Sequence, residues 1–156
     1  MTARIQLDPA RYREIYTAMF GLGTAVRRSS LEPALLELVK VRASQINGCG
    51  SCLDMHTKEA RAEGETEQRL YLTSVWREAS IYSERERGAL LWTEAVTRLE
   101  HQEVPDPVYE AVREVFSEEE MVALTLAVVE INAWNRFAIS FKRPVGDYVV
   151  GSLKPV

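Results

Sequence analysis

Cys49, Cys52 and His56 are the residues whose types and spacing are best suited to chemistry. A helix turns by about 100° per residue, so Cys52 is offset by about 60° from Cys49, and His56 by about 40° from Cys52. All three therefore share one face if a helix begins at or near Cys49. A thiol at a helix N-terminus lies beside unpaired N–H groups and the positive end of the helix dipole, which favour the thiolate. A histidine one turn along can accept the thiol proton.

The second thiol gives the pair a redox cycle. If one cysteine is oxidised to a sulfenic acid, the other cysteine can attack it and close a disulfide before over-oxidation. This is the chemistry of a peroxidase or of a dithiol–disulfide oxidoreductase.

A metal site and a pair of unreactive core cysteines are the two other interpretations. Zinc needs about four ligands, whereas the chain has two cysteines and two histidines. The second histidine, His101, is expected to be a solvated loop residue. The set of Cys49, Cys52 and His56 would leave a coordination position open. We therefore expect no metal site, with a site shared between subunits as the alternative.

The elements that must position these residues are predicted to be helices, because apolar residues recur at helical spacing and no stretch alternates with a period of two. The segment from Cys52 to Glu63 is expected to be a helix closed by Gly64. The helix before it begins at Ser30, has Pro33 in its first turn and ends at the turn signal Asn47-Gly48.

The remaining helices complete an all-α domain. The last one is apolar on nearly all sides in its first half, which is typical of a core or interface helix. It is expected to end at Pro144, and residues 145–156 are expected to be a tail that could dock on a neighbour. This last helix is expected to start at a Ser117/Glu120 capping box and to run to about Phe141. Four further helices are predicted: one from Asp8-Pro9 to Gly21 and Gly23, one over about 66–76, one that starts at a Ser83/Glu86 capping box, and one from Asp106 to Phe116.

Length and composition are those of one soluble domain, residues 1–156. The net charge of −4 and pI of about 5.3 provide no basic surface for nucleic acid. The N-terminus lacks the apolar core of a secretory signal, and the most apolar stretch, 121–129, is too short to span a bilayer. We therefore expect a cytoplasmic protein without nucleic-acid or membrane partners. In that compartment a lone Cys-x-x-Cys is more often redox-active or metal-binding than a structural crosslink.

The spacing Glu37-x₁₁-Cys49-x₂-Cys52-x₃-His56 resembles the AhpD-like alkylhydroperoxidase branch of the carboxymuconolactone decarboxylase superfamily. The resemblance covers about residues 32–99, and the stretch 132–136 is similar to a later signature of the branch. It implies a fold of about six to seven helices that self-associates, often as a trimer or hexamer. It also implies reduction of hydroperoxides at the cysteine pair, a lipoylated or thioredoxin-like reductant, and no tightly bound cofactor.

Carried over by position, the resemblance makes Cys52 the cysteine that attacks peroxide and Cys49 the resolving cysteine, with His56 and Glu37 as a proton relay. The best-known members have a second histidine immediately before the second cysteine, where this chain has Ser51. A hydroxyl is a poor base at neutral pH, so a shorter relay is expected. Judged from its helix pattern alone, Glu37 would be a solvated residue paired with Lys40.

Other conspicuous side chains have structural interpretations. Four conspicuous aromatic residues are expected to pack in the core or in an interface. Two asparagines and one arginine near the end of the last helix are expected to form a polar interface network or a helix cap. Arg136 could instead steer an anionic substrate. These residues are Tyr71, Trp76, Trp92, Trp134, Asn132, Asn135 and Arg136.

Two functional alternatives remain. A lyase like the carboxymuconolactone decarboxylases would share the scaffold but works without a reactive dithiol, so the intact cysteine pair argues against it. A redox sensor or disulfide oxidoreductase without efficient peroxide turnover would have the same residues.

The chain is expected to form a homo-oligomer. The apolar helix from Met121 and the helix that carries Leu90 and Trp92 offer more apolar surface than a core of this size readily hides. Light scattering at micromolar concentration should therefore give the mass of several subunits, and a monomer would contradict this expectation.

Overall fold

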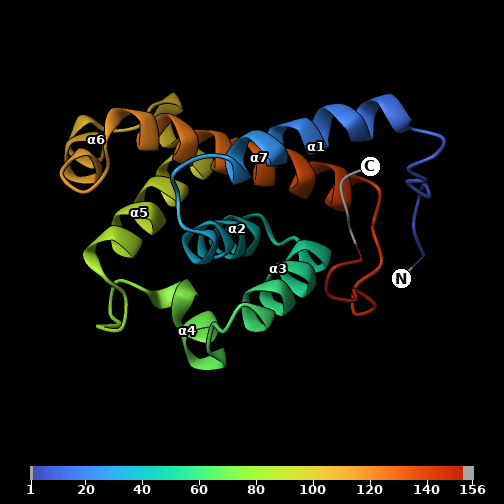
Figure 1. The fold of residues 1–156 in the computed structure, drawn as a ribbon, viewed down its shortest axis with the longest axis horizontal. Coiled ribbons are helices and arrows are strands. Elements are labelled where there is room, and N and C mark those ends of the chain that lie inside the picture. The colour runs from blue at the N-terminus through green and yellow to red at the C-terminus, as the bar shows by residue number, and fades with distance from the viewer. Residues whose placement is uncertain (1, 153–156) are drawn as a thin grey trace.

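The computed structural model describes residues 2–152, which fold into seven α-helices and two short 3₁₀ helices with no strand (Figure 1). The prediction of an all-α fold with six to seven helices is confirmed. The α-helices are α1 (Arg13–Arg27), α2 (Pro33–Asn47), α3 (Gly50–Ala62), α4 (Glu67–Leu72), α5 (Glu84–Arg98), α6 (Asp106–Arg113) and α7 (Glu118–Ser140), and the 3₁₀ helices are η1 (Thr73–Val75) and η2 (Glu100–Gln102).

Helix α2 is the central element. It packs against α3, α5 and α7, and Figure 1 shows it in the middle of the molecule, with α1 and α7 side by side along one edge. Its side chains Val39, Val41, Ala43 and Ser44 have no exposed surface. Because α2 is enclosed, its polar residues must find partners within the fold.

Several helix ends lie where local sequence signals predicted them. Ser83 with Glu86 and Ser117 with Glu120 form complete capping boxes at the starts of α5 and α7. Gly48, with φ of 68°, ends α2 in the left-handed conformation that glycine adopts without strain. These signals act within one helical turn and do not depend on tertiary packing.

Helix α1 differs from its predicted extent at both ends. Asp8 starts a turn, in which its side chain accepts a hydrogen bond from Ala10 N at 2.9 Å, and the helix begins only at Arg13. The helix then continues through Gly21 and Gly23, so the prediction that it ends there is wrong. Gly23 is instead a contact point with α7, because a Cβ at Gly23 would lie 2.5 Å from Glu130 Oε1.

Helix α7 is the one helix among residues 2–152 that is long and apolar enough to cross a bilayer, judged by length and composition alone. Here it is a core helix in contact with α1, α2, α3 and α5. Val122 and Val129 remain exposed on it. Leu90 and Trp92 of α5 are buried within the chain, so α5 does not offer the free apolar surface that the sequence suggested. Tyr71 of α4, expected in the core or in an interface, is 70% exposed in the single chain. The expectation of self-association therefore rests on α7.

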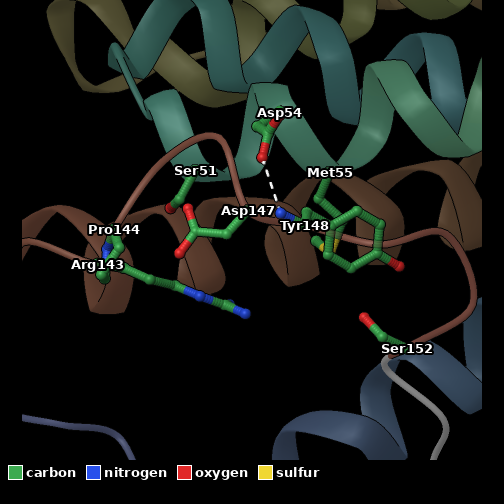
Figure 2. Close-up of a pocket in the computed structure, with 8 residues that line it drawn as sticks. All are labelled: Ser51, Asp54, Met55, Arg143, Pro144, Asp147, Tyr148 and Ser152. Carbon is green, nitrogen blue, oxygen red and sulfur yellow. Dashed lines mark hydrogen bonds between the residues drawn. The ribbon is translucent and has the colours of Figure 1, made fainter.

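The segment that follows α7 docks on α3 of the same chain, so the expectation of a tail that docks on a neighbour is wrong for residues 145–152. Lys58 Nζ donates to the carbonyl oxygens of Gly146 and Tyr148 at 3.2 and 2.9 Å. Asp54 Oδ2 accepts from the backbone N–H groups of the same two residues at 3.0 and 3.3 Å, as Figure 2 shows for Tyr148. Residues 153–156 of the expected tail lie outside the described residues.

Two glycines of α1 should respond differently to alanine. Gly21 has no atom within 4 Å of an added Cβ, so Gly21→Ala should raise the free energy of unfolding by about 0.5–1 kcal/mol, because alanine favours the helix. Gly23→Ala must displace the buried Glu130 carboxyl, so its free energy of unfolding should be lower than that of Gly21→Ala by about 1 kcal/mol or more. Urea unfolding measures both variants, and equal gains would contradict the close contact between α1 and α7.

Candidate active site

Cys49 and Cys52 are joined by a disulfide at the start of α3, with their Cα atoms 5.4 Å apart. Cys49 is the N-cap residue of α3, and Cys52 lies in its first turn, as predicted. The N–H group of Cys49 donates to Ser44 O at 2.9 Å, so the left-handed turn at Gly48 leads directly from α2 into α3. Both cysteines are buried, packed with Ile131 of α7.

An amide network ties this turn to α7. Asn47 Nδ2 donates to Asn132 Oδ1 at 2.9 Å and to Asn135 Oδ1 at 2.8 Å, and Asn135 Nδ2 donates to Ser44 Oγ at 3.1 Å. The polar network expected of these asparagines therefore lies within the chain and fixes the end of α2. Arg136 donates to Asn132 on the exposed side of α7.

Glu37 of α2 and His56 of α3 form a buried pair. His56 Nδ1 and Glu37 Oε2 are 2.9 Å apart, and Lys40 Nζ donates to Glu37 Oε1 at 2.8 Å. Glu37 and His56 are only 9% and 8% exposed. The pairing with Lys40 agrees with the helix pattern, but the interpretation of Glu37 as a solvated residue is wrong, because α3 covers this face of α2.

The environment of Glu37 keeps it ionised. Burial by itself raises the pKa of this carboxyl, but the hydrogen bond from His56 and the charges of His56 and Lys40 outweigh burial and lower the pKa to about 2. A carboxylate can only accept, so we infer that Nδ1 of His56 carries the shared hydrogen. Nε2 is then the imidazole nitrogen that can exchange a proton with another group.

A cavity of about 380 Å³ opens onto this pair and onto Cys52. Cys52 and His56 are one turn apart on α3, and both line the cavity, whereas Cys49 is buried and does not line it. The cavity thus brings together Glu37, Cys52 and His56 of the predicted site and leaves Arg136 outside. The full lining is Tyr16, Phe20, Arg27, Glu37, Lys40, Cys52, Met55, His56, Glu59, Glu63, Glu130, Ile131, Trp134, Arg143, Tyr148 and Gly151.

Sequence reasoning missed two parts of this cavity. One is an aromatic wall, in which Tyr16, Phe20 and Trp134 have ring centroids 5.6–5.8 Å apart. The other is Glu130, which is 8% exposed. A signal for Glu130 was present, because it is the only charged residue in the apolar run 121–131, and a buried carboxyl has a structural or functional partner to explain.

Ser51, at the position of the second family histidine, faces a different hollow. Its Oγ lies 3.8 Å from Cys49 Sγ, so the hydroxyl is close to Cys49. Ser51 lines a hollow of about 240 Å³ between α3 and the docked tail, with Asp54 and Asp147 (Figure 2). The hydroxyl therefore does not extend the Glu37–His56 pair into the larger cavity.

His101 lies in the exposed 3₁₀ helix η2. It lines a separate hollow with residues of α5 and the loop after it. Across residues 2–152, no group of three or more His, Cys, Asp and Glu side chains gathers closely enough to hold a metal ion.

The low pKa of Glu37 should show in acid unfolding. Its folded pKa of about 2 lies below the ordinary value of 4.5, so the ionised form contributes stability that is fully present above about pH 4.5 and is lost as the pH falls towards 2. Between about pH 5 and pH 3, the parent should therefore lose more free energy of unfolding than Glu37→Gln does, measured by urea unfolding.

Glu63→Gln is the control for this measurement. Burial and the charge of Glu37 raise the pKa of Glu63. Glu63→Gln should therefore lose at least as much free energy of unfolding between about pH 5 and pH 3 as the parent does. Parallel profiles for the parent and Glu37→Gln would contradict the assigned pairing.

Comparisons with known proteins show the family and the fold of the chain. The profile of the carboxymuconolactone decarboxylase family matches residues 13–95. The uncharacterized protein YdfG of Bacillus subtilis is 43% identical over 122 residues, which are 78% of this chain and 83% of YdfG.

Two solved structures are also similar. One is a protein of unknown function from Agrobacterium tumefaciens, a candidate antioxidant defence protein AhpD, with 41% identity, a TM-score of 0.88, and coverage of 94% of this chain and 100% of that one. The other is an uncharacterized peroxidase-related protein from Ralstonia eutropha JMP134 with an alkylhydroperoxidase AhpD core. Its identity is 21%, its TM-score 0.79 and its coverage 94% and 78%, which shows a shared fold alone. By profile match, identity and fold, the chain belongs to the carboxymuconolactone decarboxylase family, within its AhpD-like branch.

Proposed function

We propose that this protein is a thiol-dependent alkyl hydroperoxide reductase. One observation carries the proposal: Cys52 of the oxidised pair faces a cavity that also presents His56, which is hydrogen-bonded to the buried, ionised Glu37. Cys49 is 1% exposed and does not line this cavity. A peroxide that enters the cavity meets Cys52 first, which supports Cys52 as the attacking and Cys49 as the resolving cysteine.

The first half of the cycle oxidises Cys52. Nε2 of His56 accepts the thiol proton, while Glu37 stabilises the imidazolium that forms, and the helix N-terminus favours the thiolate. The Cys52 sulfur then attacks one peroxide oxygen, so that an S–O bond forms and the O–O bond breaks. Cys52 becomes a sulfenic acid, and the other oxygen leaves as an alcohol once it has gained a proton.

The second half of the cycle restores the thiols. The Cys49 thiol attacks the sulfenic sulfur of Cys52, which forms the disulfide and releases water. A dithiol reductant then attacks the disulfide, returns both thiols and leaves as its own disulfide. We propose a lipoylated or thioredoxin-like protein of the cytoplasm as this reductant. The cycle requires no tightly bound organic cofactor.

Four variants should separate the roles of the site residues. Cys52→Ser should abolish peroxide turnover, and Cys49→Ser should allow one stoichiometric oxidation of Cys52 and then stall. His56→Ala and Glu37→Gln keep both sulfurs but lose thiolate supply, so turnover should fall by about 10²–10⁴-fold, which is typical of general acid–base catalysis. Peroxide consumption is measured with lipoamide, thioredoxin and glutathione reducing systems.

The matched control is His101→Asn, which changes the other histidine and suits the positive φ of 58° at that position. It should turn over peroxide at the parent rate. A strong oxidant should still close the disulfide in His56→Ala and Glu37→Gln, because both thiols remain. Peroxide turnover by Glu37→Gln at the parent rate would remove Glu37 from the relay. A parent that is oxidised once but never turns over would instead indicate a redox sensor.

A further inference from the structure

Glu130 is a buried carboxyl group that the proposed relay does not use. It lies in the middle of α7 and is 8% exposed. Its Oε2 is buried and has no hydrogen-bond partner among residues 2–152. Its Oε1 lies against Gly23 of α1, at a distance that only a glycine at this position allows. A buried ionised carboxyl without a partner is costly, whereas a protonated one is much less so.

Glu130 belongs to the cavity onto which the reactive cysteine opens. Glu130 lines the same cavity as Cys52 and His56. The residue after it, Ile131, packs directly against the cysteine pair and also lines this cavity. The side chain therefore faces the cavity from α7, while the thiol and the imidazole face it from α3.

Glu130 and Glu37, the two buried carboxyls of the cavity, have pKa values shifted in opposite directions. Burial raises the pKa of Glu130. The positive charges of Lys40, His56 and Arg27 lower this pKa, and the charge of Glu37 raises it further. The net direction is upward, whereas the pKa of Glu37 is lowered to about 2. Two carboxyl groups whose environments separate their pKa values in this way are suited to opposite roles, one as an acid and one as a permanent anion.

We propose that Glu130 is a catalytic acid that protonates the oxygen leaving from the hydroperoxide. The proposal rests on the proposed function and assigns the donor of the proton that the departing alkoxide requires. Glu37 is unsuited to this role, because it is the ionised partner of His56 and Lys40 and carries no proton to give.

The protons and bonds balance. His56 takes the Cys52 proton, and the thiolate attacks the peroxide and becomes the sulfenic acid as the O–O bond breaks. The leaving oxygen takes the proton of Glu130 and departs as the alcohol, so Glu130 is left ionised. The imidazolium of His56 returns its proton to Glu130 across the cavity. The proton of Cys49 leaves with the sulfenic hydroxyl as water when the disulfide closes.

Leaving-group chemistry provides the test. An alkoxide is strongly basic and needs a proton to leave, whereas the acetate that leaves from peracetic acid does not. Reduced protein is mixed with cumene hydroperoxide or with peracetic acid, and thiol loss in a single turnover gives two rate constants. Thiolate supply is common to both reactions and cancels in their ratio, cumene hydroperoxide over peracetic acid, so a change in this ratio between parent and variant reports the step that differs, the protonation of the leaving oxygen.

In Glu130→Gln, which keeps the shape but has no acidic proton, this ratio should fall by about tenfold or more. Glu130→Asp keeps an acid set back by one methylene, and its ratio should lie between those of Glu130→Gln and the parent. It also serves as the test variant if Glu130→Gln does not fold, as judged by circular dichroism and Tm. Glu63→Gln removes an exposed carboxyl from the same cavity and should keep the parent ratio.

An unchanged ratio in Glu130→Gln, or an equal fall in Glu63→Gln, would overturn the assignment of Glu130 and leave the proposed function intact. A parent that reacts with both oxidants no faster than a free dithiol would overturn the proposed function, and this inference with it.

Discussion

The enclosure of α2 is the constraint on which the rest of the structure depends. A helix in contact with α3, α5 and α7 is buried along most of its length, so the buried polar side chains on it need partners within the fold. Arg42 Nη2 contacts Glu94 Oε1 of α5 at 2.7 Å, Ser44 accepts from α7, and Glu37 pairs with His56 of α3 at 2.9 Å. The candidate relay is one of several buried polar contacts that hold α2 in place, and it differs from the others because a cavity reaches it.

The site depends on the order of elements around the short turn between α2 and α3. Gly48 ends α2, and Cys49 is the N-cap residue of α3. The short turn between them fixes the position of α3, with its thiols, relative to α2, which carries Glu37. Helix α7 closes the arrangement from the other side and is tied to the turn through Asn47. The geometry of the candidate site therefore depends on the packing of three helices, although Glu37, the two cysteines and His56 come from a segment of only 20 residues, 37–56.

Most of the fold could be predicted from the sequence, because its signals are local. Capping boxes, the Asn47-Gly48 turn and the phase of Cys49, Cys52 and His56 each depend on residues within one or two turns. The burial of Glu37 could not be predicted from its helix pattern, because that pattern does not state which element covers the polar face. The same holds for Gly23, where a local rule favoured a break and a tertiary contact with α7 required a glycine inside the helix. The family resemblance provided the pairing of Glu37 with the cysteines that periodicity alone missed.

The tail that follows α7 is held almost entirely by its main chain. Asp54, Lys58 and Glu59 of α3 bond to backbone N–H and C=O groups of the segment 146–151, and the side-chain bond from Tyr148 to Glu59 is an addition to these. Main-chain N–H and C=O groups do not depend on the side chain, although Gly146 and Gly151 have φ of 109° and 73°, which favour glycine at those two positions. The Tyr148 side chain and the backbone at Gly151 also line the larger cavity, so one part of the cavity wall is attached to α3 mainly through main-chain groups. A substitution at Tyr148 would therefore reshape the cavity wall while the main-chain attachment of the tail to α3 stays in place.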